Sequence, residues 1–91
     1  MTKQMTVYFS GRVQGVGFRY TVDRIAQHFK ITGYVKNLPD GRVCLLAEGE
    51  ELDLQDFLTA IRESQMSEYI RDFQLLWSPA QGQYQDFGIA V

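Results

Sequence analysis

The chain has 91 residues, of which 45% are hydrophobic and 22% charged, and its formal net charge at pH 7 is −2. This length supports one domain over residues 1–91, and the composition excludes a wholly disordered chain. The nearly balanced charge argues against a general nucleic-acid coat and against a polybasic membrane anchor.

The single cysteine, Cys44, and the single histidine, His28, restrict the class of protein further. One cysteine forms no intramolecular disulfide, and these two residues do not reach the ligand count of a usual zinc site. No run approaches 18 apolar residues, and residues 1–5 are short and polar rather than signal-like. We therefore expect no metal, no membrane partner and a cytoplasmic location, which a free thiol also suits.

The first half of the chain predicts three strands and a helix. Alternation of polar and apolar residues predicts a strand over residues 6–12, and helical spacing of apolar residues predicts a helix from Phe18 to Phe29. Further strands are predicted over residues 32–37 and 42–48. The turn between them contains Pro39, Asp40 and Gly41, three residues that each favour a turn for a different physical reason.

The second half predicts one more helix and two strands. Acidic residues at positions 50–56 predict the start of the helix, and the residues expected on its buried face are Leu54, Phe57, Leu58 and Ile61. Strands are predicted over residues 70–77 and 87–91, on either side of a breaker at 78–82. The order β-α-β-β-α-β with a short extra C-terminal strand predicts an α+β, ferredoxin-like sandwich. Its sheet is mostly antiparallel and carries both helices on one face.

The segment Gly15-Val16-Gly17-Phe18-Arg19 lies between the first strand and the first helix. Glycines there allow the backbone to curl, so that successive N–H groups form an anion-binding nest beside the start of a helix. Arg19 adds a planar fork of donors that fits phosphate or carboxylate oxygens. Taken alone, a Gly-x-Gly turn is equally typical of a tight strand-to-helix connection with a solvated arginine.

Two other phosphate-binding motifs fail on particular residues. A dinucleotide fingerprint needs a third glycine where Tyr20 stands, and a Walker loop needs Gly-Lys-Ser or Gly-Lys-Thr, which the chain lacks.

Asn37 ends the second predicted strand. In a β-α-β unit the strands before and after the helix run parallel, so their carboxyl ends meet at one edge of the sheet. We therefore expect Asn37 to face the loop from Gly15 to Arg19. The commoner role for such an asparagine is to start a turn, here the one at Leu38 and Pro39.

We expect the remaining candidate residues to take no part in the chemistry of the site. We expect His28 to be solvated on the polar face of the first helix, and Cys44 to be a bystander thiol on the sheet face away from the helices. The carboxylates of four further residues are expected to be solvated: Asp23, Glu48, Glu50 and Glu51.

A site made of an arginine, backbone amides and a carboxamide positions and stabilises charge but moves protons poorly. Hydrolysis of a phosphate monoester needs more catalytic assistance than such a site offers. A mixed anhydride of phosphate and a carboxylic acid does not, because its carboxylate leaves without protonation. Water held in line by Asn37 then suffices.

Two long blocks, Ser10-Gly11-Arg12-Val13-Gln14-Gly15-Val16-Gly17-Phe18-Arg19-Tyr20 and Thr32-Gly33-Tyr34-Val35-Lys36-Asn37-Leu38-Pro39-Asp40-Gly41, strongly resemble the acylphosphatase family. The resemblance, to small bacterial-type members, continues in Ala47-Glu48-Gly49, Trp77-Ser78-Pro79 and Phe87. It implies a ferredoxin-like enzyme that hydrolyses acyl phosphates to carboxylate and inorganic phosphate without metal or cofactor. By match to the family motif, Arg19 and the amides of Gly15 to Arg19 bind the phosphoryl group. By the same match, the resemblance implies that Asn37 positions the attacking water.

The chain departs from the family pattern after the second helix. Relatives usually carry a Gly-Pro loop where this chain has residues 64–69, so the conformation of that loop is open. Cys44 stands where the family often has an acid. With Tyr8, Tyr34, Leu46 and Leu76 it makes the open sheet face apolar. We expect a monomer, with weak self-association as the alternative.

Three substrates present the same anhydride: acetyl phosphate, carbamoyl phosphate and a glycolytic acyl phosphate. The main alternative function is a non-catalytic module that binds acyl phosphate or carbamoyl phosphate, as in larger maturation enzymes for carbamoyl transfer. An RNA-recognition domain shares the element order. It needs aromatic residues on its third strand, and residues 42–46 contain none, so no nucleic-acid partner is expected.

Overall fold

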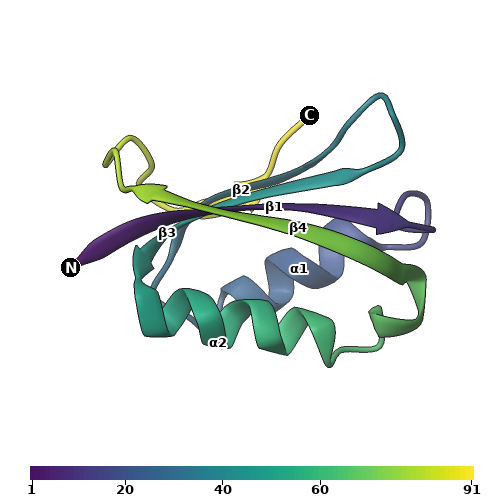
Figure 1. Cartoon of the computed structure of the whole chain (residues 1–91), viewed down its shortest axis with the longest axis horizontal. Coiled ribbons are helices and arrows are strands. Elements are labelled where there is room, and N and C mark those ends of the chain that lie inside the picture. Colours follow the sequence, from purple (N-terminus) through teal and green to yellow (C-terminus); the bar gives the residue numbers. More distant parts are fainter.

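Five strands and two α-helices form a two-layer sandwich in the computed structural model, which describes residues 1–91 (Figure 1). The elements in chain order are β1 (Thr2–Gly11), α1 (Phe18–Ala26), β2 (Thr32–Asn37), β3 (Val43–Glu50), α2 (Glu51–Arg62), the 3-10 helix η1 (Ser67–Tyr69), β4 (Ile70–Pro79) and β5 (Phe87–Ile89). Because β1 and β2 both run antiparallel to β3, they are parallel to each other, and their carboxyl ends lie at the same edge of the sheet.

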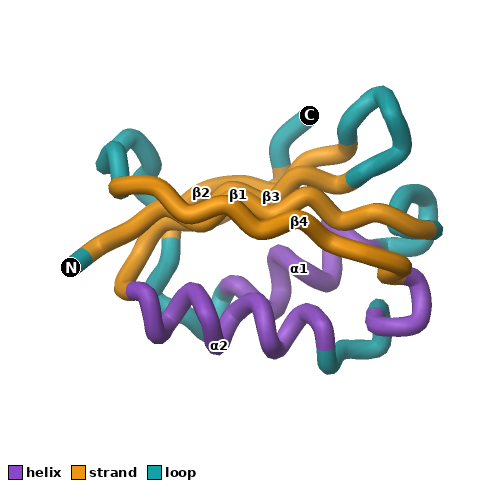
Figure 2. Tube along the Cα trace, viewed as in Figure 1, coloured by secondary structure: helices purple, strands orange, loops and turns teal.

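The sheet has the strand order β4-β1-β3-β2-β5, and only the pairing of β2 with β5 is parallel. Figure 2 shows both helices beneath one face of the sheet, while the other face is open. The predicted ferredoxin-like α+β class is therefore confirmed. No helix of this structure is both long and apolar enough to span a membrane.

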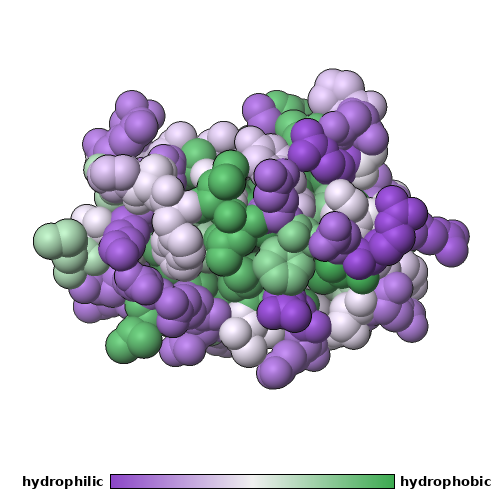
Figure 3. All heavy atoms as spheres, viewed as in Figure 1, coloured by the Kyte–Doolittle hydropathy of each residue, from purple (hydrophilic) through white to green (hydrophobic).

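The core lies between the sheet and the helices. Alternate residues of the two central strands point toward it and are fully buried, and the helices add the apolar stripes read from the sequence. Phe73 and Leu75 of β4 pack against its margin. In Figure 3 hydrophobic residues gather in the middle of the face that shows β4 and α2, with hydrophilic residues around them. The central strands contribute Met5, Val7, Phe9, Val43, Leu45 and Ala47.

Several predicted boundaries were wrong by a few residues. β1 begins at Thr2 rather than residue 6, and β3 continues to Glu50, because these ends pair with each other across the sheet. Polar residues at positions 2–4 hide that pairing in the sequence. α1 ends at Ala26 rather than at Phe29, since the N–H groups of residues 27–29 bond three residues back in tight turns.

Pro79 belongs to β4, although the sequence predicts a breaker from residue 78. β4 is an edge strand, and a proline is tolerated there because the missing N–H need not face a partner. β5 ends at Ile89, two residues earlier than predicted. The predicted turn after β2 is present: Gly41 has a φ of +95°, and the N–H of Arg42 donates to Asp40 Oδ1 at 3.0 Å.

The loop that departs from the family pattern is an ordered turn. Ser64 Oγ donates to the carbonyl of Ile61 at 2.7 Å and accepts the N–H of Met66 at 3.1 Å. Met66 is buried in the core, and η1 follows it. Without glycine and proline, this chain therefore closes the connection by a serine side chain and an apolar anchor.

Candidate active site

The connection between β1 and α1 is anchored at both ends by side chains that are 1% exposed, Val13 and Phe18. Between these anchors, Gly15 and Gly17 have φ angles of +77° and +83°, in the left-handed region. Residues other than glycine are sterically disfavoured in this region, because they carry a Cβ atom. Gly17 is also the N-cap residue of α1, so the curled backbone leads directly into the helix.

The backbone N–H groups of residues 15–19 donate no hydrogen bond within the protein. They belong to the loop and to the first turn of α1, where a helix has no acceptors of its own. Arg19 is half-buried and forms no ion pair or hydrogen bond. The loop thus presents a row of free donors and an unpaired positive charge, which together favour a small anion.

Asn37 is the last residue of β2, and its backbone lies opposite Val43 of β3. Its side-chain oxygen, Oδ1, is buried and accepts no hydrogen bond from the protein. A buried acceptor is normally satisfied by water or a ligand. Asn37 and Arg19 line one pocket of about 240 Å³, as the parallel strands predict, together with Val13, Gly15, Gly17, Phe18, Tyr20 and Ile89.

Val16 does not line this pocket; its side chain packs against the core, so only its amide is available to an anion. His28 is exposed, but it lies in the turn after α1 rather than on the polar face of the helix, because α1 ends at Ala26. Cys44 is buried, and both residues lie outside the pocket. Burial raises the pKa of the Cys44 thiol, although Lys36 and Arg42 oppose that shift, so the thiol stays protonated and unreactive at neutral pH.

No three His, Cys, Asp or Glu side chains converge as a metal site requires.

Gln14 does not line the pocket but connects its two halves, a positioning role that sequence reasoning missed. Its Nε2 donates to the carbonyls of Leu38 (2.8 Å) and Arg42 (2.9 Å), and so ties the glycine loop to the turn that follows Asn37. The N–H of Leu38 bonds to the carbonyl of Arg42 at 2.8 Å within that turn. Gln14 therefore sets the spacing between the two halves of the pocket.

We expect Gln14→Glu to lower kcat for an acyl phosphate by about tenfold to a hundredfold at pH 7.5, since small misplacements of reacting groups have effects of this size. The substitution keeps the shape but replaces two N–H donors by a carboxylate facing two carbonyls. That environment raises the pKa of the introduced carboxyl above its usual value of about 4.3. Activity relative to the original protein should therefore recover in part at about pH 5, where the protonated acid again donates.

Gln55→Glu is the matched control, because Gln55 is exposed on α2 and bonds only to Glu51. An equal loss at both pH values, or no loss at all, would show that the two hydrogen bonds of Gln14 do not position the site.

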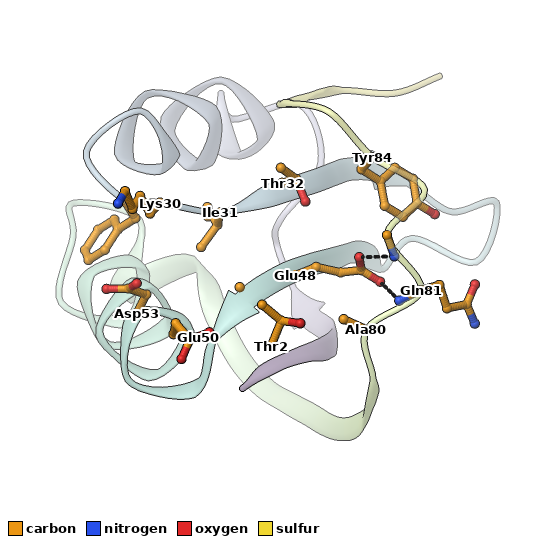
Figure 4. Close-up of a pocket in the computed structure, with 13 residues that line it drawn as sticks. Thr2, Lys30, Ile31, Thr32, Glu48, Glu50, Asp53, Ala80, Gln81 and Tyr84 are labelled. Carbon is orange, nitrogen blue, oxygen red and sulfur yellow. Dashed lines mark hydrogen bonds between the residues drawn. The ribbon is translucent and has the colours of Figure 1, made fainter.

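Glu48 corrects another expectation, since it is 5% exposed rather than solvated. Its carboxylate accepts the backbone N–H groups of Gln81 (2.8 Å) and Gly82 (3.0 Å), which fastens the loop between β4 and β5 (Figure 4). It lies in the largest hollow of the surface, about 740 Å³, among the starts of β1 and β2. This hollow is at the opposite end of the sheet from Arg19, and its one buried carboxylate is already satisfied.

The site is of the kind that binds a small oxyanion, and it sits at one edge of a ferredoxin-like sandwich. The chain itself matches the family model described as Acylphosphatase over residues 5–89. An acylphosphatase of Archaeoglobus fulgidus is 44% identical over 86 residues, which are 94% of this chain and 96% of the relative.

Solved structures agree with the sequence match. Acylphosphatase from Bacillus subtilis superposes with a TM-score of 0.89 at 39% identity, covering 98% of this chain and 99% of that one. HypF of T. kodakarensis superposes with a TM-score of 0.83 at 32% identity; the match covers 98% of this chain but only 12% of HypF. This chain belongs to the acylphosphatase family. It is an enzyme that hydrolyses acyl phosphates to a carboxylate and inorganic phosphate.

Proposed function

We propose that Arg19 and the amides of residues 15–19 hold the phosphoryl group and that Asn37 holds the attacking water. The free donors of the loop and the unpaired guanidinium of Arg19 support the first role. The observation that carries the second is the buried Oδ1 of Asn37, an acceptor without a protein donor. A water that donates to this oxygen has its lone pair free to attack.

In this mechanism the water oxygen attacks phosphorus in line with the acyl oxygen. The new bond joins the water oxygen to phosphorus, the bond from phosphorus to the acyl oxygen breaks, and its electron pair leaves as the carboxylate. The attacking water releases its proton to solvent or to a phosphate oxygen. Charge on the equatorial phosphate oxygens is stabilised by the loop amides and Arg19, the kind of contribution that dominates phosphoryl transfer.

Phosphate release from a synthetic acyl phosphate, with a phosphomonoester beside it, tests this assignment. The acyl phosphate should be hydrolysed and the monoester should not, because an alkoxide leaving group needs a strong general acid, and the pocket lining contains no histidine, aspartate or glutamate. Comparable rates on both compounds would require an acid in the site and would contradict the proposed roles.

Chelator and His28→Gln are each expected to leave activity nearly unchanged, since the proposed mechanism uses neither a metal nor an imidazole. The assay is initial-rate phosphate release with and without EDTA. Activity that EDTA abolishes and that zinc or magnesium restores would overturn the metal-free mechanism.

The alternative role is a module that binds acyl phosphate or carbamoyl phosphate without turning it over. The match to HypF, which covers 12% of that chain, shows that the same fold also occurs within a much longer protein. Saturable binding with no phosphate release would support that role. Arg19 and Asn37 in one pocket favour turnover instead.

We further propose that residues 1–91 act as one catalytic domain, monomeric and cytoplasmic. One hydrophobic core serves both helices and the sheet, which supports a single folding unit. Light scattering at assay concentration tests the oligomeric state, and a mass of twice 10.5 kDa would contradict the monomer.

A further inference from the structure

The pocket of Arg19 and Asn37 has two apolar walls that the mechanism above does not use. Tyr20 follows Arg19 in the first turn of α1 and is 64% exposed, and Ile89 belongs to β5 and is 45% exposed. Both line the pocket. Large apolar residues left exposed beside a charged site are available for contact with the rest of a bound molecule.

The sheet fixes the position of Ile89. It lies opposite Val35 in the parallel ladder of β5 and β2, and the N–H of Ala90 donates to the carbonyl of Val35 at 2.9 Å. Val35 is two residues before Asn37, so β5 runs toward the edge of the sheet that carries the site. The hydrogen-bonded ladder therefore holds the backbone of Ile89 in place at the side of the pocket.

The charges of the pocket restrict what the walls can accept. Arg19 is the sole charged residue of its lining, and the proposed function already assigns Arg19 to the phosphoryl group. An acyl part that carries a carboxylate, an ammonium group or a second phosphate would find no opposite charge there. An apolar acyl part would instead remove the exposed surfaces of Tyr20 and Ile89 from water, and an aromatic one could also stack on the Tyr20 ring.

We propose that Tyr20 and Ile89 form an acyl-group subsite that selects acyl phosphates with an uncharged, apolar acyl group, aromatic ones above all. This inference rests on the proposed roles of Arg19 and Asn37. It narrows the possible substrates away from acyl phosphates with a second charged group.

The test compares kcat/KM for benzoyl phosphate, acetyl phosphate and succinyl phosphate in the original protein, Tyr20→Ala, Ile89→Ala and the double variant. We expect the double variant to lose about tenfold more kcat/KM for benzoyl phosphate than for acetyl phosphate. The factor is modest because Tyr20 and Ile89 are already partly buried, so that binding of the acyl group removes only part of their apolar surface from water. Tyr20→Phe should retain the preference. Leu52→Ala, at a residue 74% exposed on α2, is the matched control and should change neither rate.

Competition by benzylphosphonate and methylphosphonate supplies a binding readout that does not depend on turnover. Stronger binding of benzylphosphonate, lost in the double variant, supports the subsite. Equal losses for all three substrates, or an unchanged ratio in both single variants, would overturn it. Failure of the phosphate site itself would look different, because then Arg19→Ala would leave the affinity for inorganic phosphate intact.

Discussion

Arg19→Lys is expected to lose most of the activity toward an acyl phosphate while the protein stays folded. Lysine keeps the charge but not the planar fork of donors that matches two phosphate oxygens at once. Losing charge-assisted bonds in the transition state is worth about 2 to 4 kcal/mol, or roughly one and a half to three decades in kcat/KM. The fold should survive, because Arg19 makes no ion pair or hydrogen bond within the protein.

Arg24→Lys is the control for this experiment, since Arg24 is an exposed residue near the end of the same helix and outside the pocket. Initial rates over a range of benzoyl phosphate concentrations give kcat and KM for both variants. Near-normal turnover in folded Arg19→Lys would remove the bidentate role from Arg19.

Asn37→Ala and Arg19→Ala are expected to fail in different ways. If Asn37 only orients water, Asn37→Ala loses most turnover but still binds inorganic phosphate, because the loop amides and Arg19 remain. Arg19→Ala should weaken phosphate binding as well as turnover, since it removes the positive charge of the pocket. Titration calorimetry with inorganic phosphate, beside single-turnover rates on an acyl phosphate, separates the two effects.

Asn37 also precedes the turn at Leu38, so circular dichroism must show that Asn37→Ala is folded before its kinetics are interpreted. Asn37→Asp gives a second reading. It keeps the acceptor but adds a negative charge to an anion site, so phosphate affinity should fall. A folded Asn37→Ala that loses phosphate binding as fully as Arg19→Ala would make Asn37 a second phosphate ligand rather than the holder of water.

The sequence predicted the parts of the site that depend on motif and topology. Glycines before a helix predict a curled backbone, and parallel strands predict that Asn37 faces Arg19; both are what the structure contains. The element order likewise predicted the ferredoxin-like sandwich, because the spacing of apolar residues within each short segment is enough to distinguish a strand from a helix.

Features that depend on contacts between distant segments were missed. Gln14 bonds to carbonyls 24 and 28 residues away, and nothing local to Gln14 distinguishes it from a solvated loop residue. Glu48 looks like a surface acid until the loop at Gln81 returns to cover it. The outer ends of β1 and β3 were missed for the same reason, since only their pairing makes those polar residues strands.

Hydrolysis in ¹⁸O-labelled water most directly tests whether water attacks phosphorus, which the roles given to Arg19 and Asn37 require. Single-turnover hydrolysis of benzoyl phosphate is followed by mass spectrometry of both products, with the uncatalysed reaction subtracted. The mechanism predicts one labelled oxygen in inorganic phosphate and none in benzoate, because the bond between phosphorus and the acyl oxygen is the one that breaks. Label in benzoate would mean that water attacks the carbonyl carbon, which contradicts the roles given to Arg19 and Asn37.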